Sequence, residues 1–534
     1  MNLKIILGDN CNISRLKYSF ISTLVFVLAA HAFIYFNFIP QHDGLNHALR
    51  FAGQWEVSLG RFMLPVYGLI QGNNTMPWVI GMSAILFITC TTYLITQILE
   101  IVRPIDIAIT AGFLSTNLCI TELHGTFLFT VGAYTLSLLC ATLGIYITIR
   151  QRGIVATLLS TLCLMLSLGL YQAFIPVALV LYVAVIGKAI VRVNGNMTLH
   201  QFAYQTYHII PIILGIAFYL IGYRLTMKVW QIQAPDSYNS LSRLSVLSVD
   251  CLWHSILNNY KIFGQIFFGN NVIVGNIARY CNITLVLAAL LITSQRIYRK
   301  DISAKVILFI LPMVAVFPLI TRLPSILMKA GRSGFYTSYA MFLAYPILLT
   351  IIATGNNSTK LSCFDYAQQQ GGGGTRVSNS DFAKTIAYWC FIILLLTNIR
   401  YSNGAYTIVK IMYDRAVSSM TRVLWELNNN PTYIRNKTRV VIIGEFNRRS
   451  NLNPITYNYG GYNKLSGYNE TSITYNLTFS SMASLLGEKM IIEKDDQVIE
   501  QYKEKESVRQ MPSYPDKGYC QLIEDRMVVK LSPY

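Results

Sequence analysis

Charged residues are scarce in this chain: they make up 13% of its 534 residues, whereas soluble globular proteins contain about 25%. Hydrophobic residues account for 53% of the sequence, and the mean hydropathy is +0.43. A chain with so little charge cannot cover the surface of a soluble globule. The composition therefore predicts an integral membrane protein.

Acidic residues are scarcer still, since 25 Asp and Glu face 43 Lys and Arg, which gives a formal net charge of +18. This excess does not indicate nucleic acid as a partner, because no basic patch carries a known nucleic-acid-binding motif. Many of the basic residues lie in short links between apolar runs, where they fix the orientation of a membrane protein.

Several catalytic motifs are absent. The sequence has no HExxH, GxSxG or GxxxxGK[ST] pattern, and no Asp-x-Asp pair of the kind that holds a metal and a nucleotide sugar. Soluble nucleotide-donor chemistry is thus disfavoured. No cofactor and no metal site are expected, and whether a divalent ion assists is left open.

The apolar runs predict about eleven membrane-spanning helices, because one crossing takes about 20 apolar residues. We expect them near residues 17–38, 76–98, 104–121, 126–149, 154–170, 172–191, 208–226, 279–295, 305–322, 333–354 and 384–399. Basic residues fall in alternate links, as at Arg103, Arg150, Lys188 and Arg296, which is the pattern of the positive-inside rule. The N-terminus is then cytoplasmic, and an odd number of crossings puts the C-terminus outside.

Hydropathy changes near residue 400 and divides the chain into two expected domains. Residues 1–399 form a transmembrane domain with outer loops at 39–75 and 227–278, where we expect amphipathic helices at the membrane surface. Residues 355–383, rich in Gln and Gly, are typical of a flexible linker on the cytoplasmic side. Residues 400–534 form a small α/β domain outside the membrane. Its first helix should end at Asn430-Pro431, and strands are expected at 439–444, 471–479, 490–493 and 527–531.

The polar segment after the first span, residues 41–50, places a carboxylate at the membrane surface. From Leu45 onward, apolar residues recur every three or four positions, which predicts one helix lying in the interface plane. Asp43 is the candidate general base, because it can accept a proton from an incoming hydroxyl. Asp43 is equally suited to be the N-cap of this helix. His42 beside it is a candidate for substrate binding.

Two further polar pairs lie near the outer ends of spans. Glu122 and His124 occupy a very short outer turn, where a second acid or a hydrogen-bonding group for a sugar hydroxyl is plausible, and a solvated turn pair is the alternative. Tyr171 and Gln172 follow the helix break at Gly169 and either line a substrate cavity or serve in packing.

A set of cations also lies on the expected outer side. Arg332, Lys329 and Arg61 are candidates for holding a lipid phosphate through charge-assisted hydrogen bonds, together with Arg322. The alternative is that each one anchors the protein at the headgroups with an extended side chain. His31, inside the first span, is expected to hydrogen-bond to a neighbouring helix.

Short motifs spread over most of the chain resemble the Gtr-type O-antigen glucosyltransferases, which are phage-associated serotype-converting enzymes. They are His42-Asp43-Gly44-Leu45, Ser58-Leu59-Gly60-Arg61-Phe62, the run from Ser167 to Ile175, Val441-Ile442-Ile443-Gly444, Met511-Pro512-Ser513-Tyr514-Pro515 and Val528-Val529-Lys530-Leu531. Members of this family often carry two adjacent acids in the first loop, whereas this chain has the single Asp43.

The resemblance implies a GT-C-like polytopic α-helical enzyme of the bacterial inner membrane. Such an enzyme takes glucose from undecaprenyl-phosphate-glucose and adds it to the O-antigen of lipopolysaccharide at the periplasmic face. Its partners are then the lipid donor, the O-antigen polysaccharide and membrane lipids, with a functional link to a sugar-lipid synthase and a flippase. Asp43 would act as the base of an inverting transfer, and Arg332, Lys329 and Arg61 would hold the departing phosphate.

Two other classes of function share a lipid-linked substrate. A transporter or flippase would use the same spans, with Asp43 and Arg332 as binding charges. The absence of an apparent internal repeat weighs against it. An O-antigen polymerase or acyltransferase would use the lipid-linked substrate without the sugar donor.

Overall fold

The structure is a computed structural model and describes residues 10–40, 43–48, 53–196, 198, 201, 206–233, 249–269, 275–299, 301–327, 335–353, 379–444 and 476–533. Within these residues, nine helical segments are long and apolar enough to cross a membrane. The longest elements in them are α2 (Asn10–Phe36), α6 (Pro77–Leu99), α7 (Pro104–Thr116), α9 (Val131–Arg150), α11 (Ile175–Arg192), α13 (Ile210–Val229), α15 (Gly275–Tyr298), α16 (Ala304–Thr321) and α20 (Asn379–Asn429). The polytopic helical fold predicted from composition is confirmed.

Two shorter apolar helices, α10 (Ile154–Leu170) and the run of η6 and α18 over Tyr339–Ala353, coincide with the two remaining predicted spans. Each of the eleven predicted segments is thus largely helical. Nine are long enough to cross by length and composition, so the count of eleven crossings stays a prediction.

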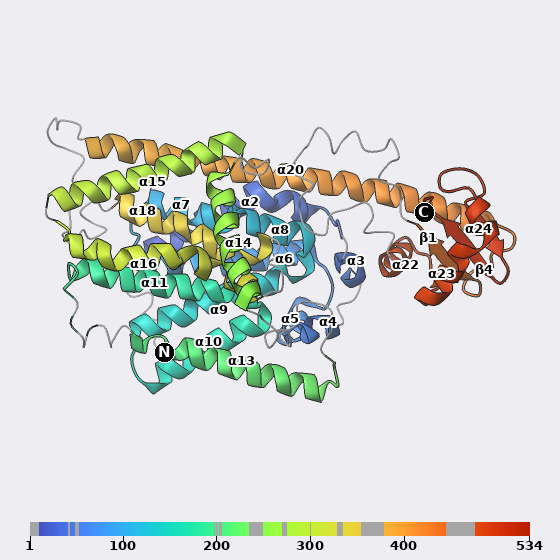
Figure 1. Ribbon diagram of the computed structural model, residues 1–534, viewed down its shortest axis with the longest axis horizontal. Helices are drawn as coiled ribbons and strands as arrows, with labels where there is room; N and C mark the ends of the chain where they lie inside the picture. Colours follow the sequence, from blue (N-terminus) through green and yellow to red (C-terminus); the bar gives the residue numbers. More distant parts are fainter. Residues whose placement is uncertain are drawn as a thin grey trace.

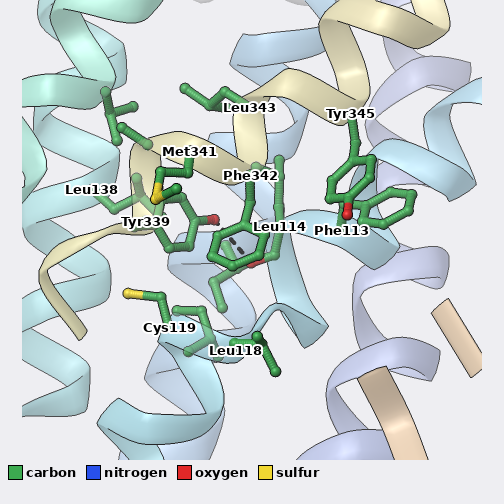
Figure 2. Packing of buried hydrophobic residues seen from close by; sticks show 14 of the residues in the cluster. Phe113, Leu114, Leu118, Cys119, Leu138, Tyr339, Met341, Phe342, Leu343 and Tyr345 are labelled. Carbon is green, nitrogen blue, oxygen red and sulfur yellow. Dashed lines mark hydrogen bonds between the residues drawn. The ribbon is translucent and has the colours of Figure 1, made fainter. Parts of the chain in front are cut away.

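The centre of the bundle is a hydrophobic core built from α2, α6, α7, α9, α11 and α18 (Figure 1). Figure 2 shows part of it, where residues from α7 face the η6–α18 segment. The rings of Phe113 and Tyr345 stack at 3.9 Å between centroids, and the hydroxyl of Tyr339 donates to the carbonyl oxygen of Leu114 at 2.8 Å. Aromatic stacking and satisfied polar atoms fix the helices in one arrangement.

The loop at residues 39–75 differs from the prediction, because it does not form a single interfacial helix. The loop forms three short helices, α3 (Asp43–His47), α4 (Gln54–Ser58) and α5 (Leu64–Gln71). Gly53 and Gly60 adopt φ angles of 75° and 90°, in the left-handed region that interrupts a helix and that glycine tolerates. Apolar spacing alone did not reveal these interruptions.

The segment at residues 227–278 contains α14 (Val249–Phe268), which confirms an amphipathic helix there. Figure 1 shows α14 running across the direction of α15 and α16. Its polar residue Asn259 is buried against the protein, whereas Trp253 and Leu257 are exposed. Exposed apolar residues on such a helix are suited to contact with lipid.

Helix α20 contains 51 residues and ends at Asn429, directly before Asn430-Pro431 as predicted. The expected domain boundary at residue 400 falls inside this helix. Figure 1 shows α20 leaving the bundle and reaching the C-terminal unit without a break. Of the segment expected to be a linker, residues 355–378 lie outside the described residues, and residues 379–383 are the start of α20 instead.

The C-terminal unit has a four-stranded sheet in the order β2-β1-β4-β3. Strand β1 (Arg439–Ile443) runs parallel to β2 (Ile491–Ile492) and β4 (Arg526–Lys530), and β3 (Cys520–Ile523) is antiparallel to β4. Three of the predicted strands are thereby confirmed. The fourth is wrong within the described residues, because residues 476–479 begin helix α22 (Asn476–Leu485).

Both faces of this sheet are covered, because successive side chains of a strand point to opposite sides. Val440 and Ile442 pack with the end of α20 and with α22. Val441 and Ile443 pack on the other face with α23 (Asp496–Glu504) and α24 (Glu506–Gln510). Helix α20 therefore belongs to the bundle at one end and to the core of the C-terminal unit at the other.

Candidate functional site

Arg61 lies where the loop at residues 39–75 meets the bundle. Its Nη1 donates to the hydroxyl of Tyr134 at 2.8 Å, and its guanidinium lies 5.7 and 5.2 Å from the ring centroids of Tyr134 and Tyr171. These two rings stack on each other at 3.9 Å. The cation is thus held against aromatic faces, where the ring quadrupole attracts it.

The break between α10 and α11 shapes this place. The carbonyl oxygen of Gly169 accepts a hydrogen bond from the amide of Met63 at 3.0 Å, and a Cβ on Gly169 would come within 2.8 Å of the Met63 side chain. Gln172 donates to the carbonyl oxygen of Leu59 and to the hydroxyl of Tyr219, each at 2.9 Å. The first loop can approach the break this closely only because residue 169 has no side chain.

The guanidinium of Arg61 keeps hydrogen-bonding capacity to spare. Its Nε has no hydrogen-bond partner among the described residues, and none of the carboxylates described there forms an ion pair with it. Burial alone would lower the pKa of Arg61, but Tyr134, Tyr171 and the charge of Glu56 raise it above its ordinary value. A permanently charged, planar donor is the group that best matches a phosphate.

Asp43 is the first residue of α3, and its side chain is partly exposed. Helix α3 packs against the turn before α9, where the ring of His47 stacks on Phe129 at 4.6 Å. Asp43 therefore lies on a helix held next to the start of α9, the helix that carries Tyr134. The structure brings together Arg61, Tyr134 and Tyr171 from three segments far apart in sequence.

Glu56 is a second carboxylate at this site that sequence reasoning missed. It is 3% exposed, its Oε1 lies 3.1 Å from His47 Nε2, and its Oε2 has no hydrogen-bond partner among the described residues. The available signal was that Glu56 is the sole acid between Asp43 and Glu100. Buried carboxylates are costly unless paired or used in function.

Glu122 and His124 do not lie in a solvated turn, and that expectation is wrong. Both belong to helix α8 (Leu118–Thr126) and are 1% exposed. His124 accepts a hydrogen bond from the Tyr35 hydroxyl at 2.6 Å, donates to the carbonyl oxygen of Ile120 at 2.8 Å, and stacks on His31 at 4.2 Å. With both ring nitrogens bonded, His124 contributes to packing between helices.

His31 bonds across helices, as predicted. Its ring nitrogens contact the Tyr406 hydroxyl at 2.7 Å and the carbonyl oxygen of Ser115 at 2.8 Å. The three remaining candidates, His42, Lys329 and Arg332, lie outside the described residues. The neighbouring Arg322 is described: it is 1% exposed, and its Nε donates to Asn259 Oδ1 of α14 at 2.9 Å.

Within the described residues, no group of three or more His, Cys, Asp or Glu side chains is placed to hold a metal ion. The site consists of one cation held against two phenol rings, with two carboxylates nearby. Such an arrangement can bind an anionic group and accept a proton beside it.

The model of the family described as glucosyl transferase GtrII matches residues 32–351, more than half of the chain. The chain belongs to this glucosyl transferase GtrII family. The matched segment includes Asp43, Glu56, Arg61, Tyr134 and Tyr171, so the whole site lies within the part shared with the family. No curated protein and no solved structure matches the chain.

Membership of the GtrII family confirms the resemblance that the short motifs indicated. The protein is a membrane glycosyltransferase whose family transfers glucose. This result favours sugar transfer over transport, polymerisation or acyl transfer.

Proposed function

We propose that this protein transfers glucose from undecaprenyl-phosphate-glucose to the O-antigen of lipopolysaccharide, at the periplasmic face of the bacterial inner membrane. The observation that carries the proposal is the guanidinium of Arg61. It rests on Tyr134 and Tyr171 and has an unused Nε. Helix α3, which begins with Asp43, packs against Phe129 just before α9, the helix that carries Tyr134. A cation near an acid suits a reaction in which a phosphate leaves as a hydroxyl is deprotonated.

In the proposed reaction, Asp43 accepts the proton of an acceptor hydroxyl as the oxygen attacks the anomeric carbon of glucose. The bond from that carbon to the phosphate oxygen breaks, and the electron pair leaves with the phosphate. Attack from the opposite side inverts the configuration. Arg61 stabilises the negative charge that collects on the departing phosphate, because its planar donors fit phosphate oxygens.

Other parts of the chain have supporting roles in the proposal. Lys329 and Arg332 add positive charge around the phosphate, and the outer loop at residues 227–278 guides the lipid. The C-terminal unit stands in the periplasm and meets the polysaccharide, while the N-terminus is cytoplasmic. A sugar-lipid synthase and a flippase supply the donor.

The experiment that tests this function is transfer in isolated membranes containing the protein. With undecaprenyl-phosphate-glucose and O-antigen acceptor, we expect one hexose added per repeat, read by mass spectrometry of the polysaccharide. With nucleotide sugar alone and no carrier lipid, we expect none. Transfer in the second case would contradict the proposal.

The Asp43→Asn protein tests the base directly. Asparagine caps a helix about as well as aspartate but cannot accept the proton, so we expect kcat to fall about 10²–10⁴-fold with the fold retained. The matched control is Asp414→Asn, on the exposed side of α20. Full activity of Asp43→Asn would remove this residue from the mechanism.

A further inference from the structure

We propose that the C-terminal unit positions the catalytic carboxylate, with Leu45, Asn46 and Ser481 as the positioning residues. This inference rests on the proposed function, because it concerns the placement of Asp43 in that reaction. The C-terminal unit is then needed for the chemical step itself, in addition to any contact with the acceptor.

Helix α3, which begins with Asp43, is packed against the C-terminal unit on one side. Leu45 is 3% exposed and belongs to the same buried cluster as Met420 of α20 and Phe479 of α22. The hydroxyl of Ser481 in α22 donates to Asn46 Oδ1 at 2.8 Å. Figure 1 shows α3 in the space between the bundle and α22.

The other side of α3 is held by the membrane domain. The ring of His47 stacks on Phe129 at 4.6 Å, and its Nε2 contacts Glu56 Oε1 at 3.1 Å. A Cβ on Gly44 would lie 3.8 Å from the ring of Phe129. Helix α3 is therefore held between the membrane domain and the C-terminal unit. The residues that follow Asp43 contact both of them.

A helix of five residues has no stability of its own, because its nucleation cost is not recovered over one turn. The position of α3 is consequently set by what it touches. Asp43 is two residues from Leu45, so a change at the contact with α22 moves the carboxylate. A displacement of about 1 Å at a catalytic group costs up to roughly 10²-fold in rate.

Positioning and acceptor binding predict different kinetics. If the C-terminal unit served in acceptor recognition alone, a change at its contact with α3 would leave kcat intact and at most raise the acceptor KM. If it positions Asp43, kcat falls while the KM of the lipid donor is unchanged.

The test uses the full-length protein in membranes. Leu45→Ala and Ser481→Ala are expected to lower kcat, by about 10-fold or more for Leu45→Ala, through misplacement of the base. Leu45→Met and Ser481→Thr keep the apolar contact and the hydroxyl, and they should retain most of the activity. The matched controls are Leu69→Ala, a leucine 73% exposed on α5, and Ser484→Ala, an exposed serine of α22 that bonds within its own helix.

A second measurement reports the contact without using activity. In a protein with Asn46→Cys and Ser481→Cys, a short bifunctional thiol reagent should link residues 46 and 481, and tryptic mass spectrometry detects the linked peptides. Each protein that carries one of the two substitutions is the control for the ten native cysteines. Bridged protein should retain transfer, because the link preserves the native spacing.

The outcomes separate the two proposals. Unchanged kcat in both Leu45→Ala and Ser481→Ala, in a protein that does transfer glucose from carrier lipid, overturns the positioning role. So does failure to cross-link. A wild-type protein that cross-links but does not use carrier lipid overturns the proposed function, and with it the role given to Asp43.

Discussion

The side chain of Arg61 illustrates how a residue can be half-buried and still available. Its guanidinium face is occupied by Tyr134 and Tyr171, which replace water without neutralising the charge. The donors on its edge remain suited to an anion. An ion pair with a carboxylate would have consumed those donors.

Replacing Arg61 with lysine should raise the KM for the lipid donor. Lysine keeps the charge but loses the planar fork and the stacking on the rings. The loss of one charge-assisted hydrogen bond costs about 1.5–3 kcal/mol, which corresponds to a rise of roughly 10- to 100-fold in donor KM. The measurement is the rate of glucose transfer as a function of the lipid-donor concentration. The control is Arg422→Lys, at an exposed position of α20. A donor KM equal to that of the wild type would argue against phosphate binding by Arg61.

At the scale of residues, the sequence revealed some members of the candidate site and not others. Asp43, Arg61 and Tyr171 were identified because each is polar near the end of an apolar run. Glu56 was missed because its partner His47 is nine residues away, and nine residues in one continuous helix place two side chains on opposite faces. The pair meets because Gly53 interrupts the helix.

At the scale of elements, the sheet of the C-terminal unit is tied together by a buried carboxylate. Glu493 follows β2 and accepts hydrogen bonds from Arg439 Nη1 of β1 at 3.3 Å and from Arg526 Nε of β4 at 3.1 Å. Burial would raise the pKa of Glu493, but the amides of Asp495 and Lys494 and the two guanidinium groups lower it below its ordinary value. One side chain thus joins three strands.

Stability of this sheet should depend on pH through Glu493. A folded-state pKa below the unfolded one gives stabilisation that is present above the unfolded value, near pH 4.3, and is lost as pH falls through the folded value. Glu493→Gln should lower the unfolding free energy by about 1–3 kcal/mol at pH 7 and weaken its dependence on acid. Thermal unfolding of the full-length protein in detergent at pH 7 and pH 4 measures both effects.

The control for that variant is Glu500→Gln, whose side chain is 65% exposed. Equal unfolding temperatures for Glu493→Gln and the wild type at pH 7 would show that the carboxylate does not stabilise the sheet.

Helices and strands were predictable where the sequence has one clear pattern of apolar residues. Apolar runs located the nine helical segments that are long enough to cross a membrane within the described residues, and short runs rich in valine and isoleucine located β1 and β4. The strand expected at residues 471–479 was wrong because β-branched residues there favour a strand locally. The residues that follow, including Met482 and Ala483, bury one face of a helix against α20. Packing with a distant element decided the outcome, and a single sequence does not display it.

At the scale of the whole molecule, α20 connects the hydrophobic core of the bundle to that of the C-terminal unit. Ile408 and Val409 belong to the core of the bundle, whereas Ala416 and Met420 belong to the core of the C-terminal unit. The change from one core to the other takes place around Tyr413 without any break in the helix.

Inserting one alanine after Asp414 should uncouple the two bodies. One extra residue turns the rest of the helix by about 100° and lengthens it by about 1.5 Å, so α22 no longer faces α3. We expect membrane insertion to continue and glucose transfer to fall at least about 10-fold, measured on the same membranes. Asp414→Ala is the control for the side chain. A wild-type rate of glucose transfer in the insertion variant would show that α20 does not set the position of the C-terminal unit relative to the bundle.

A helix of 51 residues is about 75 Å long, and it is a stiff rod anchored at one end among its neighbours in the bundle. Its free portion acts as a lever arm, since a tilt of a few degrees at the anchor sweeps the far end through several ångströms. The sheet and α22 travel with that end, while His47 keeps α3 fastened to the bundle. A tilt of α20 would therefore strain α3, the single helical turn that begins with Asp43.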